Sequence, residues 1–433
     1  MDEFELTIDK IVAGGFGLGF HNEKAVFVPF STPGDHLLVT VTKQYKNHSF
    51  AAIKKIITPG SGRTPPQCLH YGKCGGCQLQ HISAKLQGEV KANFVAESIQ
   101  RIGKINPDGI VAKLKSSPLH VGYRRRAGLK VRVIKSGVLL GFFAAGTHRV
   151  VDLSSCPILD PRLNDIVEPL RGLINSLKDK NFIPEVDCVA GDENIGLVFH
   201  TLRAFCKSDL DRLKAFAKEQ QLPQLWVQQG KKARLRSIHS NKVLSYELEE
   251  FSINFKPGDF IQVNGAANRL LVAEVLKAIG DDLTDKNGVV WDLFCGIGNF
   301  TLPLAKKFAK VYGVESQPRA LERLSQNVKL ANIDNIIPIK ADLFKPFGLD
   351  KLNELDKADL VLLDPPRSGG IELVKRVVKI QPQKLVYISC DSATFARDAG
   401  VLVNGGYTLN SLLPIDLFPQ TSHVEMVGVF EVK

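Results

Sequence analysis

The sequence predicts a multidomain α/β protein made of a small β-barrel, an α+β region and a doubly wound parallel sheet. Three observations lead to this fold class. Residues 3–57 alternate short strand-like runs with turn signals, residues 120–255 mix strand-like and helical runs, and strands alternate with helices from residue 256 onward. A chain of 433 residues has room for two to four domains. We therefore expect three domains, at residues 1–60, 68–255 and 256–433.

The N-terminal segment predicts an OB-like barrel because several β-rich runs follow one another closely. The runs are FELTIDKIV, KAVFVPF, HLLVTVTKQ and FAAIKKII, and the turn signals GGFG, TPGD and KNHS separate them. Short strands joined by regular turns commonly close into small barrels. The segment TPGSGRTPP at 58–66 is rich in proline and glycine, and we interpret it as a linker.

Four cysteines predict a metal site in the central region. Cys68, Cys74 and Cys77 form a Cys-x5-Cys-x2-Cys pattern, and Cys156 follows in SSCPILD. The N-terminus lacks a signal-peptide core and the chain has no run of 18 apolar residues, so we expect a cytoplasmic protein that spans no membrane. Cysteines in that compartment are thiols, metal ligands or nucleophiles rather than disulfides. The pattern is typical of a metal-cluster cradle, with a structural zinc site as the alternative.

A glycine-rich turn opens the doubly wound region. In GVVWDLFCGIGNFTLPLA, Asp292 ends a strand, Gly296 and Gly298 let the backbone approach a ligand, and Glu315 closes the next strand. A carboxylate there can accept hydrogen bonds from two ribose hydroxyls. The turn lacks the third glycine of the dinucleotide fingerprint and follows an acidic residue, which favours S-adenosylmethionine over NAD. A glycine turn without any ligand is the remaining alternative.

The segment LVLLDPPRSGG places Asp364 after another strand-like run, at the sheet edge where ligands collect. Two prolines stiffen the loop that follows this residue. A similar Asp/Asn-Pro-Pro loop holds the target base in amino-methylating enzymes. The motif therefore favours methyl transfer to a base without identifying the atom, and a purely structural loop is the alternative.

Cys390 and Glu425 are the candidate catalytic pair. Cys390 lies between the run LVYIS and a predicted helix, whose N-terminus favours the thiolate; a buried apolar cysteine is the alternative. Glu425 lies in an apolar run, where an acid is costly unless it is paired or functional. Methylation of carbon 5 of uracil needs a thiolate that adds to carbon 6 and a base that removes the proton from carbon 5.

Positive charge is concentrated in stretches that contain no acidic residue. Residues 36–88 have seven Lys or Arg, and residues 109–151 have nine. The most basic segments are GYRRRAGLK, with Arg124, Arg125 and Arg126, and GKKARLRS, with Lys231, Lys232, Arg234 and Arg236. Together with a net charge of +11, these stretches favour a nucleic-acid phosphate backbone as the partner, with solvated surfaces as the alternative.

Taken together, the segments resemble the RNA 5-methyluridine methyltransferase family over almost the whole chain. The matching segments are CxxxxxCGGCQLQH, GYRRRA, CPIL, GDFIQVN, DLFCGIGNFTLPLA, GVE, LLDPPRSG, ISCDSATFARD and FPQTSHVEMV. The resemblance implies a TRAM β-barrel, a central RNA-binding domain with a [4Fe-4S] cluster, and a Rossmann-like methyltransferase domain that uses S-adenosylmethionine. Because the barrel segment is present, it implies the 23S rRNA branch and a uridine of the uracil-1939 type.

The resemblance also assigns roles to individual residues. It implies that Cys390 is the nucleophile and Glu425 the base. The residues that it implies around the cofactor or target are Gln262, Phe294, Asn299, Glu315, Asp342 and Asp364, and the implied cluster ligands are Cys68, Cys74, Cys77 and Cys156. In the family the segment after the first cluster cysteines packs on the catalytic domain, so residues 86–117 can do so here.

One position departs from the family. Many members have Asn-Pro where this chain has Asp391-Ser392, and an acid beside the thiol could raise its pKa. The remaining cysteines, which match no cluster position and which we interpret as packing residues, are Cys188, Cys206 and Cys295.

Several alternatives stay open at this point. The same chemistry could act on another 23S uridine or on the tRNA T-loop uridine. An amino-methylating enzyme would not need Cys390, and a non-catalytic RNA-binding iron–sulfur protein would not need the glycine turn with Glu315. A radical methylthio-transferase would need cysteines separated by three and two residues, whereas five and two separate them here. We expect a monomer that acts on RNA and not on DNA.

Overall fold

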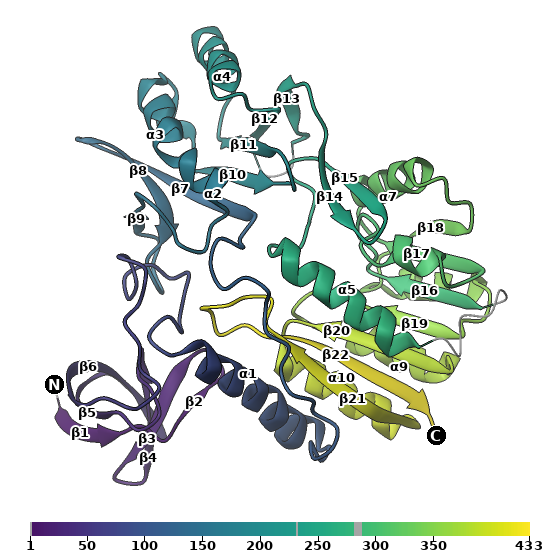
Figure 1. The fold of residues 1–433 in the computed structure, drawn as a ribbon, viewed down its shortest axis with the longest axis horizontal. Helices are drawn as coiled ribbons and strands as arrows, with labels where there is room; N and C mark the ends of the chain where they lie inside the picture. Colours follow the sequence, from purple (N-terminus) through teal and green to yellow (C-terminus); the bar gives the residue numbers. More distant parts are fainter. Residues whose placement is uncertain (1, 231–232, 281–287) are drawn as a thin grey trace.

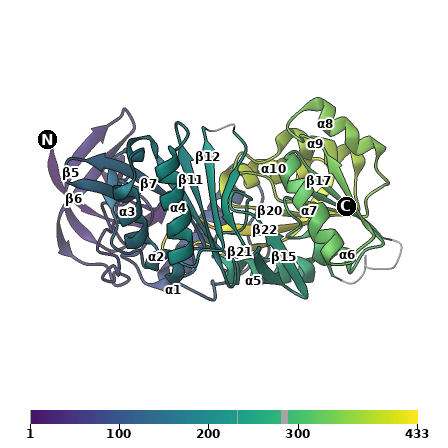
Figure 2. The same cartoon turned by 90° about the horizontal axis from the view of Figure 1, so that it is seen from above.

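The computed structural model describes residues 2–230, 233–280 and 288–433. The N-terminal barrel and the central domain lie on one side of the molecule, and the C-terminal domain lies on the other (Figure 1). Viewed from above, the molecule is elongated, with the barrel at one end and the C-terminal domain at the other (Figure 2). Among the described residues, every helix is too short or too polar to cross a membrane.

The N-terminal barrel is a six-stranded sheet in the order β1-β5-β6-β4-β3-β2. This order begins and ends with strands that are consecutive in the chain, and Gly19 of β3 packs directly against Leu6 and Thr7 of β1, so the two ends of the sheet meet and form a barrel. Alternate side chains such as Val28 and Leu37 point inward and form its core. The strands are β1 (Glu3–Thr7), β2 (Lys10–Val12), β3 (Phe16–His21), β4 (Lys24–Pro29), β5 (His36–Gln44) and β6 (His48–Thr58).

The central domain has a seven-stranded sheet in the order β13-β12-β11-β10-β7-β8-β9, in which only β11 and β12 are parallel. Apolar residues at helical spacing, such as Leu170, Leu173 and Leu213, pack its helices on the sheet. The strands are β7 (Arg126–Ile134), β8 (Gly137–Phe143), β9 (Val150–Asp152), β10 (Glu185–Ala190), β11 (Ile195–Thr201), β12 (Gln224–Gln229) and β13 (Arg236–Ser240). The helices are α2 (Pro161–Asp165), α3 (Val167–Ser176), η2 (Lys180–Phe182) and α4 (Lys207–Glu219).

The C-terminal domain is doubly wound around a seven-stranded sheet in the order β18-β17-β16-β19-β20-β22-β21. The first five strands are parallel, and β22 runs antiparallel to both of its neighbours. All four residues of β19 are apolar and buried, as expected of a strand covered on both faces. The strands are β16 (Val289–Leu293), β17 (Lys310–Glu315), β18 (Ile336–Lys340), β19 (Leu360–Leu363), β20 (Lys384–Ser389), β21 (Tyr407–Ile415) and β22 (Glu425–Val432).

Helices cover both faces of this sheet. The helices are α5 (Gly265–Ile279), α6 (Thr301–Ala305), α7 (Pro318–Leu330), α8 (Pro346–Asp350), η3 (Lys351–Glu354), α9 (Ile371–Ile380) and α10 (Ser392–Asn404). The hairpin of β14 (Leu244–Leu248) and β15 (Phe251–Phe255) packs into the same core as α5. The core therefore begins near Leu244, before the boundary at residue 256 that the sequence predicts, because a hairpin pattern does not reveal which core it joins.

The segment that follows the loop at residues 68–77, the cysteine loop, also packs on the C-terminal domain. Helix α1 (Ala84–Ser98) continues into the π-helical turn η1 (Ile99–Gly103), and Val95 and Ile99 join the core that contains Phe395 of α10. Further along, Ala112 N donates to Leu412 O at 2.8 Å, so the chain runs beside β21. Figure 1 shows α1 between the barrel and the C-terminal domain.

Candidate active site and cysteine loop

The carboxyl edge of the parallel sheet gathers most of the candidate residues. Glu315 ends β17, Asp364 directly follows β19, and Cys390 directly follows β20. Glu425 begins β22, and because this strand is antiparallel, its first residue lies at the same edge. All four residues line one cleft of about 1870 Å³, which residues of the barrel, the central domain and the C-terminal domain enclose. The fold thus brings together three acids, a thiol and the glycine turn.

The turn after β16 has a backbone that requires glycine. Gly296 has φ +56° and a side chain added there would meet no atom within 4 Å, whereas Gly298 has φ +105° and a side chain would collide with Leu302. The first glycine therefore leaves open space at the cleft, and the second permits close packing of the helix. Glu315 Oε2 accepts from Gly296 N at 3.3 Å, and its Oε1 accepts from Gln317 N at 2.8 Å. These bonds fix the carboxylate beside the turn.

Behind the turn lies Asp292, an acid that is fully buried. Its Oδ2 accepts from Thr301 Oγ1 at 2.6 Å, while its Oδ1 has no hydrogen-bond partner within the described part of the chain. Burial, with a smaller contribution from the charge of Glu315, raises the pKa of Asp292 to about 7. An unsatisfied buried acceptor at this place fits a site that is completed by a ligand or water.

The other predicted binding residues lie along the same cleft. Asn299 is held by Asn268 through two hydrogen bonds, of 2.8 and 3.0 Å. Asp342 Oδ1 accepts from Phe344 N at 3.1 Å, and the half-exposed Phe344 ring lies 5.5 Å from that of Phe294. The two rings form an apolar wall near Glu315. Gln262 also lines the cleft.

Burial controls the electrostatics of the candidate catalytic pair. It raises the pKa of Cys390 to about 11, assisted by the charges of Glu425 and Asp364 and opposed by Arg367. It also raises the pKa of Glu425 well above the ordinary value, with Asp364 contributing and Arg367 again opposing. Burial, followed by the charge of Asp292, raises the pKa of Asp364 to about 7. The site therefore disfavours negative charge unless a cation enters it.

Arg367 is a residue that the sequence reasoning missed. It is the last residue of the DPPR motif, lines the cleft, and donates to His423 Nε2 at 3.2 Å. Its positive charge opposes the pKa rise of both Cys390 and Glu425. The available signal was a cation three residues after Asp364, in a loop already expected to reach the ligand.

The departure at Asp391 has a structural explanation. This residue caps α10, because its Oδ1 accepts from Ala393 N at 3.1 Å and from Thr394 N at 2.9 Å. The acids whose charges raise the pKa of the Cys390 thiol are Glu425 and Asp364, from neighbouring strands. Burial is the main cause of the rise in the pKa of Cys390, and the contribution of negative charge that the sequence led us to expect from Asp391 therefore comes from Glu425 and Asp364.

The four predicted metal-ligand cysteines line another part of the same cleft. They come from the loop at 68–77 and from the segment before α2, and the loop is tied to the central sheet by Gly75 N, which donates to Phe143 O at 3.0 Å. Burial raises the pKa of Cys77 to about 12, and the charges of Cys156, Cys74 and Cys68 contribute. The four sulfur atoms thus share one environment, in which thiolates are stable only beside a cation.

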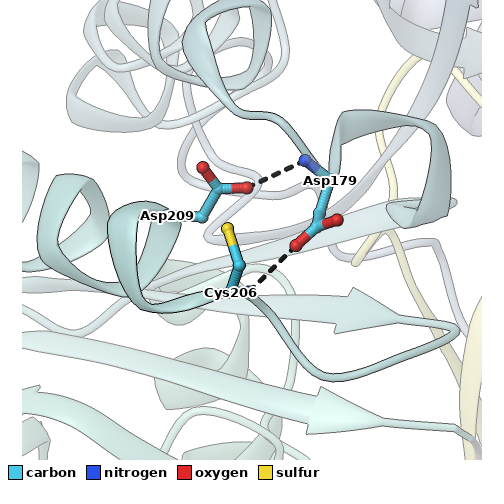
Figure 3. Close-up of side chains that lie close together, drawn as sticks. All are labelled: Asp179, Cys206 and Asp209. Carbon is cyan, nitrogen blue, oxygen red and sulfur yellow. Dashed lines mark hydrogen bonds between the residues drawn. The ribbon is translucent and has the colours of Figure 1, made fainter.

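A second group of possible metal ligands lies in the central domain (Figure 3). It consists of Asp179, Cys206 and Asp209. Asp209 accepts from Asp179 N at 2.8 Å, and Asp179 accepts from Cys206 N at 2.9 Å. These carboxylates are occupied in hydrogen bonds that tie the start of α4 to the backbone at residues 178–179, so we interpret the group as structural. We expected Cys206 to be a packing residue, but it is exposed, whereas Cys188 and Cys295 are buried as expected.

The basic segments differ in their environments. Arg124 lines the cleft. Arg125 is only 4% exposed, donates to Gln262 O at 2.8 Å and stacks 4.4 Å from the Tyr246 ring. It therefore packs against two residues that line the cleft and holds them in place. Arg126 donates to Asp259 O. In the GKKARLRS cluster, Arg234 and Arg236 are exposed, and Lys231 and Lys232 lie outside the described residues.

Comparison with known proteins identifies the family. Residues 106–433 match the family model described as tRNA (uracil-5-)-methyltransferase. The chain belongs to this family. It is 36% identical over 437 residues to the 23S rRNA (uracil(1939)-C(5))-methyltransferase RlmD of Alkalilimnicola ehrlichii, covering 99% of this chain and 97% of that protein. It is also 36% identical over 430 residues to the protein of the same name from Aeromonas salmonicida, covering 99% and 96%.

The fold of this uracil-5-methyltransferase family member has a counterpart among solved structures. The crystal structure of Pyrococcus abyssi tRNA (uracil-54, C5)-methyltransferase, in complex with S-adenosyl-L-homocysteine, superposes with a TM-score of 0.74. The two chains are 23% identical, and the match covers 98% of this chain and 100% of the other. The multidomain α/β architecture predicted from the sequence is therefore confirmed as that of a methyltransferase.

Proposed function

We propose that the protein methylates carbon 5 of a uridine in 23S rRNA, with S-adenosylmethionine as the methyl donor. The observation that carries this proposal is the meeting of Cys390 and Glu425 in one cleft with the glycine turn. The relatives named for uracil 1939 align with nearly the whole chain, which favours that position as the target.

The cleft fits the proposed cofactor. S-adenosylmethionine supplies a methyl group carried on a positively charged sulfur. The open space at Gly296 lets a ligand approach the backbone, and Glu315 keeps lone pairs that can accept from ribose hydroxyls. Phe294 and Phe344 offer a flat apolar wall for a base. The raised pKa values of Asp364 and Glu425 mean that a cation in the cleft would favour their charged forms.

The residues support covalent activation of uracil. Cys390, as a thiolate, forms a bond to carbon 6, and the electron pair of the carbon 5–carbon 6 double bond moves toward carbon 5 and the carbonyl at carbon 4. The electron pair at carbon 5 would then form the bond to the methyl group of S-adenosylmethionine, whose methyl–sulfur bond breaks and leaves its electron pair on the sulfur of S-adenosylhomocysteine. Glu425 removes the proton from carbon 5, the double bond re-forms, and the carbon–sulfur bond breaks to return the thiolate. Arg367 supplies positive charge beside the thiol.

We also propose that Cys68, Cys74, Cys77 and Cys156 hold a [4Fe-4S] cluster and that residues 1–60 form a TRAM domain. Four thiols are the usual ligand set of such a cluster. Their common environment supports the assignment. The closed six-stranded barrel and its contribution to the cleft support a role of the N-terminal domain in RNA binding.

The proposal is tested by methyl transfer to RNA. Labelled S-adenosylmethionine is incubated with the protein and either a 23S rRNA fragment or tRNA, and the modified nucleotide is mapped. We expect 5-methyluridine in the 23S fragment with the wild-type protein. Cys390→Ala should abolish transfer while leaving cofactor affinity largely intact, because the thiol acts on uracil. Near-normal turnover by Cys390→Ala would instead favour amino methylation, and labelling of tRNA alone would reject the rRNA target.

A further inference from the structure

We propose that helix α1 positions the catalytic base, through Gln87 and Lys91. These two residues hold the loop at residues 416–424, the base loop, so that Glu425 and His423 face Cys390. The inference rests on the proposed carbon-5 chemistry. It assigns positioning roles to residues that lie more than 300 positions from Glu425 in the chain.

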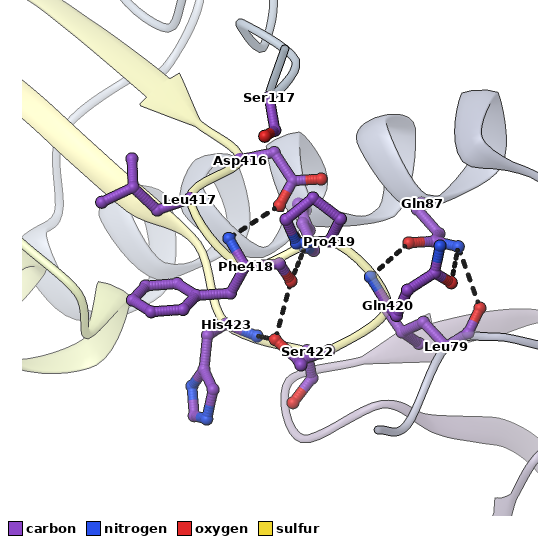
Figure 4. A network of polar contacts seen from close by, with 12 residues as sticks. Leu79, Gln87, Ser117, Asp416, Leu417, Phe418, Pro419, Gln420, Ser422 and His423 are labelled. Carbon is purple, nitrogen blue, oxygen red and sulfur yellow. Dashed lines mark hydrogen bonds and ion pairs between the residues drawn. The ribbon is translucent and has the colours of Figure 1, made fainter. Parts of the chain in front are cut away.

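The base loop needs partners from outside itself. It connects β21 to β22, and its side chains Phe418 and His423 line the cleft immediately before Glu425. Gln420, at its tip, has φ +72°, a conformation that a residue with a side chain adopts only when its surroundings enforce it. Figure 4 shows this loop between α1 and the segment that contains Leu79.

Gln87 joins the base loop to the segment that follows the cysteine loop. It is 3% exposed, and its Oε1 accepts from Gln420 N at 2.9 Å (Figure 4). Its Nε2 donates to Gln420 Oε1 at 3.0 Å, to Leu79 O at 3.1 Å and to Ile82 O at 3.0 Å. Both polar atoms of one buried amide are therefore used to connect these two segments.

The residue after the third cysteine of the loop makes direct contacts as well. Gln78 N donates to Gln420 O at 3.1 Å, and Leu79 N donates to the same oxygen at 3.0 Å. In return, Ser422 N donates to Gln78 Oε1 at 3.3 Å. The segment directly after the cysteine loop and the base loop thus share a continuous set of hydrogen bonds. These bonds fix the backbone of the base loop.

Lys91 anchors the start of the base loop. Its side chain is fully buried, and its Nζ donates to Asp416 Oδ1 at 2.6 Å and to Phe418 O at 3.0 Å. A buried ion pair contributes little net stability, because both charges lose their hydration, so a role in fixing one conformation fits better. Gln87 and Lys91 are four positions apart and lie on the same face of α1. One helix therefore holds both the beginning and the tip of the loop.

The test measures the step that depends on the base. In Glu425→Gln, a covalent protein–RNA adduct that carries the new methyl group should accumulate, because the proton on carbon 5 is not removed. Gln87→Leu should accumulate the same methylated adduct, with its breakdown slowed about 10–100-fold, the usual cost of misplacing a catalytic group. Cofactor affinity should not change. The conservative Gln87→Glu, which keeps an acceptor for Gln420 N, should release product at an intermediate rate.

Two further variants separate positioning from general stability. Gln420→Gly adopts the positive φ without strain and removes the side-chain hydrogen bonds with Gln87 and with the His120 carbonyl, so it should also slow adduct breakdown. Lys85→Ala removes a side chain of α1 that is 89% exposed, and it should behave as wild type. Hydrogen exchange in the base loop should be faster in Gln87→Leu and unchanged in Lys85→Ala, a readout that does not depend on activity.

The outcomes distinguish this inference from the proposed function. If Glu425→Gln accumulates the adduct but Gln87→Leu and Gln420→Gly release product at the wild-type rate, the positioning role is overturned and the chemistry stands. If Gln87→Leu does not fold, Gln420→Gly decides alone. If Glu425→Gln turns over normally without an adduct, Glu425 is not the base and the positioning role fails with it, whereas the methyl transfer to RNA still supports the proposed activity.

Discussion

At the scale of single residues, burial sets the chemistry of the cleft. It is the largest cause of the raised pKa of Cys390, Asp364 and Glu425, and the charges of the acids then add to it. The positive charge of Arg367 opposes the rise in the pKa of Cys390 and of Glu425. Because the proposed donor carries a positive sulfur, its binding would favour ionisation of the thiol and of the acids together. A thiol that ionises only in the loaded site is protected from alkylation and oxidation at other times.

The first prediction concerns the pH dependence of Cys390 reactivity. Its pKa is raised to about 11, so at neutral pH most of the thiol is protonated and alkylation by iodoacetamide should be slow and should accelerate as pH rises. Glu425→Gln removes a negative charge that contributes to this rise. The pKa of Cys390 should then fall, and alkylation should be faster at every pH at which Glu425 of the wild-type protein carries charge.

The measurement is mass spectrometry of the peptide that contains Cys390 after timed alkylation. Glu431→Gln is the matched control, because Glu431 belongs to the same strand, β22, but lies near its other end. The control should react at the wild-type rate. Equal rates in wild type and Glu425→Gln would contradict the electrostatic coupling between the two catalytic candidates.

At the scale of structural elements, direction along the sheet decides which residues meet. The parallel strands β17, β19 and β20 deliver Glu315, Asp364 and Cys390 to one edge. Glu425 joins them only because β22 is antiparallel, so that its beginning lies where the parallel strands end. The proposed cysteine site is assembled differently, since three of its cysteines come from one loop and Cys156 comes from a segment beyond β9.

The second prediction concerns the metal content of the cysteine loop. Protein purified without air should be brown and contain about four iron atoms per chain, as four thiolates usually bind a [4Fe-4S] cluster. Cys156→Ser should lower the iron content, because one ligand is lost. Cys206→Ser is the matched control: it removes an exposed cysteine outside the loop and should leave the iron content unchanged. Elemental analysis that finds zinc in place of iron would contradict the assignment.

At the scale of the whole molecule, one cleft connects all three domains. Phe16 of the barrel lines it together with Cys77 and Cys390. Aromatic contacts continue outward across the barrel surface, from Phe16 to Phe50 at 5.5 Å and from Phe50 to Phe27 at 5.4 Å. Such side chains can stack on unpaired bases, while nearby lysines contact phosphates. The geometry suits a single-stranded RNA segment that passes the barrel and presents one base to the catalytic domain.

The third prediction concerns the salt dependence of RNA binding. Arg124→Ala should weaken binding and reduce the slope of log affinity against log salt by about 0.7 to 0.9, the effect of losing one phosphate contact. Arg125→Ala is the informative comparison, because the buried Arg125 supports Gln262 and Tyr246. It should lower the thermal stability and leave the salt slope unchanged. Titration of a fluorescent rRNA fragment at several salt concentrations measures the salt slope of both variants, and thermal unfolding measures their stability. An unchanged slope in Arg124→Ala would mean that Arg124 contacts no phosphate.

The sequence by itself determined what local patterns encode. Strand and helix alternation predicted the doubly wound domain, and the spacing of Gly296 and Gly298 predicted a ligand turn whose positive φ angles require glycine. The motifs were also sufficient for the family, which the comparisons confirm. These features depend on residues within one or two elements, so they can be predicted from the sequence without knowledge of the tertiary packing.

Only the tertiary structure decided the features that depend on distant residues. The burial of Arg125 beneath Tyr246 is invisible in a run of three arginines, and the capping role of Asp391 depends on where α10 begins. The contact between Gln87 and Gln420 joins positions 333 residues apart. No local pattern specifies such a pair, because periodicity shows which face of a helix is covered but not which loop covers it. The sequence therefore supplied the reactive groups, and the packing of α1 on the last domain placed the loop that leads to Glu425.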